Sequence, residues 1–161
     1  MMPQYKHLKY DPALLIPKPY YGDPKGSFVV SSSQMEIALQ KSSVAKELLA
    51  EVWFSIATAG PPGHVHGGCQ AAVLDEMMGS TGWHHGYPVV AAKIEVEFLE
   101  MVPVNAQYSL RGRITSVENR KIYIEAELFD KMKTYARSKG LFITLTEEQK
   151  QDLARKMKTS Q

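Results

Sequence analysis

Apolar and polar residues alternate through much of the second half of the chain. Apolar side chains recur at every second position in residues 94–98, 108–114 and 122–128, which is the period of strands with one buried face. The positions between them carry charges of both signs and predict a solvated outer face. These charged residues are Lys93, Glu95, Glu97, Arg111, Arg113, Glu125 and Glu127.

The first half predicts two more strands and one helix. Residues 27–40 are β-branched and alternating, and residues 51–58 alternate in a way that places Ile56 on the buried side of a second strand. The Gly-Pro-Pro-Gly of residues 60–63 then ends that strand. Residues 69–84 predict the one long internal helix, which has almost no polar face and is therefore expected to be buried nearly all round.

The order of these elements predicts the fold class. Residues 118–121 and 130–133 supply turn chemistry for hairpins, and residues 135–145 predict a last long strand. Two strands, one buried helix and four antiparallel strands indicate an α+β fold in which a curled sheet wraps around a single helix. The uncovered edges of such a sheet favour self-association as a dimer or a dimer of dimers.

The chain divides into three segments by composition. Residues 1–26 contain five prolines and predict an extended arm that lies against the domain or a neighbouring subunit. Residues 27–146 form the expected domain, and residues 147–161 a polar C-terminal helix or tail that Thr146 can cap. No apolar run matches a signal peptide or a membrane span, so we expect a cytoplasmic protein.

Charge and cysteine content narrow the function classes. The net charge is only +2, with 19 basic and 17 acidic residues, which is too balanced to predict nucleic-acid binding. The single cysteine, Cys69, excludes a disulfide within the chain. Any anionic ligand is therefore expected to be bound by local contacts.

Candidate chemistry gathers where the internal helix begins. Gly67 and Gly68 follow His66 directly, and backbone N–H groups in a first helical turn lack internal acceptors, so they can stabilise a developing oxyanion. Asp75 follows nine residues after His66 and has apolar neighbours. Burial of a carboxylate among them costs free energy unless it is paired or has a chemical role. Glu76 is its rival, but about 100° of helix rotation separates the two positions, so one pocket faces only one of them.

These residues carry a family resemblance. The His-Gly-Gly of residues 66–68 with an acid at Asp75 resembles hotdog-fold acyl-CoA thioesterases of the phenylacetyl-CoA thioesterase type. The stretch is most similar to the thioesterase-superfamily branch that includes the C-terminal modulator protein. The similarity covers about residues 51–145, including residues 60–63 and the turn at residues 117–121. It implies a hotdog fold and hydrolysis of an acyl-CoA to a free acid and coenzyme A.

The resemblance also implies roles for single residues. The Gly67 N–H would hold the thioester oxygen with Gly68 beside it, His66 would position the thioester, and Asp75 from the facing subunit would be base or nucleophile. Coenzyme A would enter as part of the substrate, with no separate cofactor. Two basic residues match a pair that lies near the coenzyme A phosphates in relatives, namely Arg120 and Lys121.

One position departs from the family pattern. Relatives often carry serine or threonine sixteen residues beyond the acid to hold the attacking water, and that position is Ala91. Ser80, Thr81 or His84 are candidate replacements, and Glu76 remains an alternative acid. Without a replacement, the chain could be a non-catalytic acyl-CoA-binding or regulatory module.

Other chemistry is less well matched. The histidines and Cys69 around the helix have spacings that fit neither a paired-histidine zinc site nor a four-ligand structural one, so no metal is expected. The Asp-to-His spacing of a hotdog hydratase is not visible either.

Overall fold

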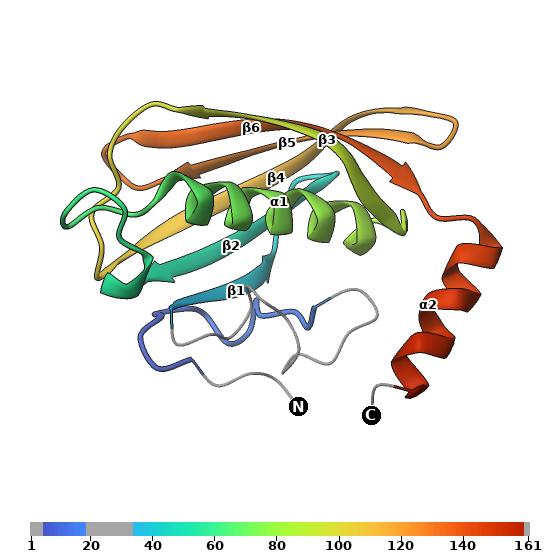
Figure 1. Ribbon diagram of the computed structural model, residues 1–161, viewed down its shortest axis with the longest axis horizontal. Helices are drawn as coiled ribbons and strands as arrows, with labels where there is room; N and C mark the ends of the chain where they lie inside the picture. The colour runs from blue at the N-terminus through green and yellow to red at the C-terminus, as the bar shows by residue number, and fades with distance from the viewer. Residues whose placement is uncertain (1–4, 19–33, 160–161) are drawn as a thin grey trace.

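Six antiparallel strands form one sheet that curls around a single long helix. The structure, a computed structural model, describes residues 5–18 and 34–159. The strands follow the spatial order β1-β2-β4-β5-β6-β3, and α1 lies along one face of the sheet (Figure 1). The elements are β1 (Met35–Lys41), β2 (Glu47–Phe54), α1 (Gly67–His84), β3 (Val89–Phe98), β4 (Ala106–Glu118), β5 (Lys121–Phe129), β6 (Thr134–Thr144) and α2 (Glu147–Thr159). The predicted α+β class is confirmed.

The hydrophobic core lies between α1 and the inner face of the sheet. Leu74, Met77 and Met78 of the helix are fully buried and meet inward-facing side chains from the strands. Full burial of each such side chain stabilises the fold by roughly 1.5–3 kcal/mol. The largest buried strand residues are Met35, Ile37, Leu48, Phe54, Leu110, Ile122, Ile124, Leu128 and Phe142.

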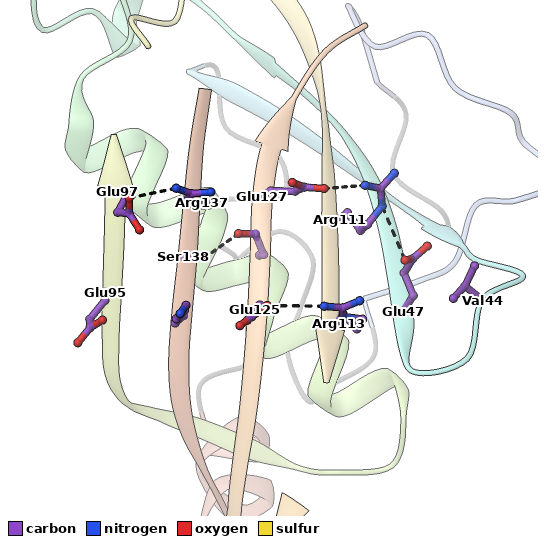
Figure 2. Close-up of a pocket in the computed structure, with 12 residues that line it drawn as sticks. Val44, Glu47, Glu95, Glu97, Arg111, Arg113, Glu125, Glu127, Arg137 and Ser138 are labelled. Atoms are coloured by element: carbon purple, nitrogen blue, oxygen red, sulfur yellow. Dashed lines mark hydrogen bonds and ion pairs between the residues drawn. The ribbon is translucent and has the colours of Figure 1, made fainter. Parts of the chain in front are cut away.

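Charges on the outer face of the sheet alternate from strand to strand. Glutamates of β3 and β5 flank basic residues of β6 and β4, as Figure 2 shows around a shallow hollow of about 510 Å³. The cross-strand ion pairs are Arg137–Glu97 (3.4 Å), Arg113–Glu125 (3.7 Å), and Arg111 with both Glu127 (2.6 Å) and Glu47 (3.7 Å). Opposite charges in register favour this pairing by roughly 0.2–1 kcal/mol each. The predicted solvated outer face is confirmed.

The first half of the chain differs from expectation at two boundaries. β2 spans Glu47–Phe54, so Ile56 leaves the sheet and is 68% exposed in a 3-10 turn. The Ser55 hydroxyl accepts the Ala57 N–H and so begins that turn. The described part of the first strand begins at Met35, while residues 27–33 of the predicted strand lie outside the described residues.

Two expectations of burial were wrong. Helix α1 is not buried all round, because Ala71, Asp75 and Glu76 lie on a half-buried side that the sheet does not cover. On β3, Val96 is only half-buried and Phe98 is 53% exposed. The reason is topological: β3 is an edge strand that pairs with β6 alone. In the part of the chain that the structure describes, its other edge has no partner strand.

The two terminal segments contact the domain differently. Arm residues 5–18 lie beside β1 (Figure 1), where Leu15 pairs with Gln40 in an antiparallel bridge. Helix α2 begins with a capping box, in which Thr146 and Gln149 each accept the other's backbone N–H.

Neither α1 nor α2 has the length and apolarity that a membrane crossing needs, as far as residues 5–18 and 34–159 are concerned.

Close packing of α1 on β4 makes a first prediction. A methyl group at Gly112 would overlap the Thr81 hydroxyl and lie 3.3 Å from the Met77 carbonyl oxygen. Gly112→Ala is therefore expected to destabilise the domain by about 1–3 kcal/mol in urea unfolding. Adding Thr81→Ala should recover part of that loss, and equal stability of both variants and the parent would contradict this packing.

Candidate active site

The start of α1 exposes one backbone donor. His66 is the N-cap residue, its backbone N–H donates to the Thr58 carbonyl (2.7 Å), and its Nδ1 accepts the Gly68 N–H (2.8 Å). The Gly68 amide, expected to help bind substrate, is thus already occupied. The Gly67 N–H meets no acceptor among residues 5–18 and 34–159. It is the donor that can hold an oxyanion here.

The tautomer of His66 follows from this bond. Because Nδ1 accepts from Gly68, a neutral His66 ring carries its proton on Nε2. The side chain is exposed, so that Nε2–H is available to a ligand at the helix start. This arrangement fits the positioning role expected of His66.

An aromatic ring borders the free amide. A methyl group built on Gly67 would lie 3.4 Å from Cζ of Phe98, which places this ring of β3 beside the helix start. Phe98, Leu99 and Met101 are each at least two-fifths exposed and form an apolar rim. Sequence alternation assigned Phe98 to the core, and only its position on an edge strand reveals this rim.

Asp75 lies on the half-buried side of the same helix. Burial, and then the negative charge of Glu76, raises the pKa of the Asp75 carboxyl. Asp75 is eight residues beyond Gly67, and at 1.5 Å per residue the two positions are about 12 Å apart along the axis. One chain alone therefore does not bring both groups to a single carbonyl carbon.

A cavity of about 520 Å³ opens beside Asp75. Apolar side chains from α1, β3, β6 and α2 form most of its wall. Ala91, the residue at the position of the expected hydroxyl, and Asp75 both line this cavity. The remaining lining residues are Glu76, Gly79, Trp83, Val89, Val90, Phe142, Leu153, Lys156 and Met157.

Glu76 is held by the N-terminal arm. Lys18 Nζ lies 3.3 Å from Glu76 Oε1, and these side chains are only 11% and 12% exposed. Glu76 was predicted as an alternative to Asp75, whereas its contact with Lys18 was not predicted. The ion pair commits Glu76 to a structural contact, whereas Asp75 forms no ion pair with any of the described residues.

Known proteins share part of this sequence and the fold of the chain. Residues 62–135 match the family model of the thioesterase superfamily. The crystal structure of a thioesterase superfamily protein superposes with a TM-score of 0.63 at 28% identity, over 67% of this chain and 53% of that one. The chain has the hotdog fold of that structure, and residues 62–135 resemble the thioesterase superfamily. The hotdog fold expected from the sequence is confirmed.

Two further proteins are similar to this chain, one in sequence and one in fold. Acyl-coenzyme A thioesterase THEM5 of Mus musculus is 33% identical over 96 residues, which are 58% of this chain and 39% of the relative. The chain thus spans well under half the length of that protein. A Streptococcus mutans UA159 protein solved bound to acetyl CoA shares the fold, with a TM-score of 0.63 at 12% identity over 74% of this chain and 94% of its own.

The proposed replacements for the missing hydroxyl do not line the cavity beside Asp75 in the hotdog domain. The Thr81 hydroxyl is fully buried and donates to the Met77 carbonyl (2.7 Å), and Ser80 is fully buried as well. His84 is exposed near the helix end, where partial burial and then His85 lower its pKa. None of these three candidates therefore supplies the hydroxyl that Ala91 lacks in the described part of one chain.

The basic pair lies at the far end of the hotdog domain from Gly67. Arg120 donates through Nε and Nη2 to the Thr144 carbonyl (3.2 and 2.9 Å). Thr144 pairs with Val89, the start of β3 that directly follows α1. Helix α1 has 18 residues and is about 27 Å long. Arg120 and Lys121 are exposed but do not reach the Gly67 amide of their own chain.

The described residues form no cluster of side chains suited to bind a metal ion. No three histidine, cysteine or acidic side chains come together among them as metal ligands do. Burial raises the pKa of the Cys69 thiol, which disfavours the thiolate that metal binding or nucleophilic attack needs.

Proposed function

We propose that the chain hydrolyses acyl-CoA thioesters to a free acid and coenzyme A. The observation that carries this proposal is the Gly67 N–H at the start of α1, which has no acceptor among the described residues, on a helix that also presents half-buried Asp75. The similarity to THEM5 and the acetyl CoA in a protein of the same fold support the substrate class.

In this mechanism the carbonyl of the thioester is polarised at the helix start. Its oxygen accepts the Gly67 N–H and lies at the positive end of the α1 dipole, where a developing oxyanion is stabilised. The His66 Nε2–H adds a second donor beside it. A water molecule attacks the carbonyl carbon and gives a proton to Asp75. The C–S bond then breaks, and protonated Asp75 returns that proton to the sulfur, which leaves as the coenzyme A thiol.

The acid in each site comes from a second copy of the chain. About 12 Å along α1 separates Gly67 from Asp75, so a partner helix has to present its own Asp75 to the thioester. Two features support such an assembly, namely the unpartnered edge of β3 in the described chain and the side of α1 that the sheet leaves uncovered. We propose a homodimer, or a dimer of such dimers.

Arg120 and Lys121 give this proposal a binding prediction. Both side chains are exposed, Arg120 in the turn after β4 and Lys121 at the start of β5, where two cations can bind phosphate without making the chain basic. The double variant Arg120→Gln/Lys121→Gln is expected to raise KM for acyl-CoA about tenfold with little change in kcat. KM for an acyl-pantetheine thioester, which lacks the nucleotide phosphates, should stay the same. An equal rise for both substrates would contradict phosphate binding.

The direct test is release of free thiol from a panel of acyl-CoAs. The panel spans acetyl, medium-chain, long-chain and phenylacetyl thioesters, since the apolar cavity beside Asp75 admits either an aliphatic or an aryl group. Turnover of at least one thioester well above the rate without protein is expected. Absence of turnover across the panel would refute the hydrolase.

A second candidate function rests on Ala91. This residue lines the cavity without a hydroxyl to hold water, which favours a non-catalytic module that binds acyl-CoA. Calorimetry with the same panel separates the two functions, because saturable binding without thiol release is the result that the binding module predicts.

A further inference from the structure

The N-terminal arm reaches the helix that carries Asp75. Two contacts fix its path across the domain before it arrives there. The Glu36 carboxylate of β1 accepts the backbone N–H groups of Lys6, His7 and Leu8 at 2.9–3.1 Å. Further along, Ile16 donates to the Leu39 carbonyl (3.0 Å). Lys18 then follows, two residues beyond this last anchor.

The ion pair that Lys18 makes with Glu76 is unlike those on the outer face of the sheet. Its two side chains are 11% and 12% exposed, whereas Arg137 and Glu97 of an outer pair are 60% and 62% exposed. Exposed pairs contribute little, but loss of one partner from a buried pair leaves an uncompensated charge behind. Substitution of Lys18 therefore removes a positive charge from beside the nearly buried Glu76 carboxylate, next to Asp75.

We propose that Lys18 is a positioning residue of the active site, which holds Glu76 in place and screens its charge from Asp75. This inference rests on the proposed thioesterase function for its kinetic consequences. Lys18 touches neither the thioester nor the attacking water, and acts through Glu76.

The charges around Asp75 decide the sign of the effect. Glu76 is its neighbour on α1, and Lys156 of α2 lines the same cavity and lies 3.8 Å from Asp152. The cavity-lining residues of β3 and β6 carry no charge. Burial, followed by the Glu76 charge, already raises the pKa of Asp75. Substitution of Lys18 by a neutral residue removes one positive charge that opposes Glu76, so the pKa of Asp75 is expected to rise further.

A base must be ionised to accept a proton, so activity falls as pH decreases through the pKa of Asp75. In Lys18→Met, the acid limb of kcat/KM is expected to move to higher pH, with roughly a three- to tenfold loss on that limb. The alkaline plateau should be unchanged. Lys18→Arg, which keeps the charge, should retain the wild-type profile, and Lys18→Met/Glu76→Gln should restore the acid limb to wild type or below. A uniform loss at all pH values, or a limb that does not move, would overturn the proposal.

A second readout does not depend on turnover. Carboxyl carbons labelled with ¹³C in aspartate report the titration of Asp75 by NMR, with the signal assigned by its loss in Asp75→Asn. The Asp75 midpoint is expected to rise in Lys18→Met and to return in the double variant, while thermal melts show that each variant is folded. If the Asp75 midpoint shifts in Lys18→Met but the protein hydrolyses no acyl-CoA, the proposed function is refuted and the positioning role is not. Hydrolysis with an Asp75 midpoint that ignores Lys18 would refute the positioning role alone.

Discussion

Replacement of Asp75 by asparagine is expected to lower kcat for acyl-CoA hydrolysis by about 10²- to 10⁴-fold. The amide has nearly the same shape as the carboxylate but takes no proton from the attacking water. The domain should remain folded, because a half-buried carboxyl with a raised pKa does not stabilise the folded chain at neutral pH. Thiol release at saturating substrate, measured beside a thermal melt, checks both expectations.

A matched acid-to-amide change elsewhere controls for general effects of charge. Glu125→Gln removes one carboxylate from the outer face of the sheet, where it pairs with Arg113 at 3.7 Å, and should leave kcat unchanged. Similar losses in Glu125→Gln and Asp75→Asn, or undiminished turnover in Asp75→Asn, would remove Asp75 from the mechanism.

Gly67→Pro is expected to lower kcat by about 10²- to 10³-fold, the usual cost of losing one oxyanion donor. Proline lacks the N–H that the mechanism assigns to the carbonyl oxygen. Gly67 is the first residue of α1, where proline is well tolerated, and His66 before it is already extended at φ −60° and ψ 139°. Circular dichroism should therefore show a folded domain, while single-turnover kinetics with a reactive acyl-CoA should show slow chemistry.

Gly67→Ala separates the donor from the space around it. The alanine keeps the N–H, and its methyl group would sit 3.4 Å from the Phe98 ring, an ordinary contact distance. Its kcat should exceed that of Gly67→Pro by at least about tenfold. Equal kcat values for the two variants would mean that steric blockage, and not the lost hydrogen bond, accounts for the effect.

Much of the fold could be predicted because its signals are local. Alternation in residues 94–128 and the turn residues between the strands specify hairpins, and Thr146 with Gln149 specifies the start of α2. The end of β2 was missed because Ile56 continues the alternation while the Ser55 hydroxyl turns the chain away. Phe98 was misplaced because alternation marks a face of a sheet but does not reveal which strand lies at the edge.

The candidate site was predictable only in part. The first turn of α1 and Asp75 lie within ten residues of sequence, so helix geometry gives their separation along the axis. The contact between Lys18 and Glu76 joins residues 58 positions apart, and no periodic pattern links them. The wall that α2 adds to the cavity likewise depends on tertiary packing. Thr81 was named as a water-binding candidate, but its hydroxyl is taken by the Met77 carbonyl on the buried side of the helix.

Each site of the proposed dimer joins Gly67 of one chain to Asp75 of another, so a mixture of two inactive variants should regain activity. Asp75→Asn and Gly67→Pro chains are unfolded together, refolded as a mixture, and assayed, with native mass spectrometry to count mixed dimers. Random pairing makes half of the dimers mixed, each with one intact site, so about a quarter of wild-type activity is expected. Mixed dimers that hydrolyse no acyl-CoA, although each variant binds it, would contradict a site shared between two chains.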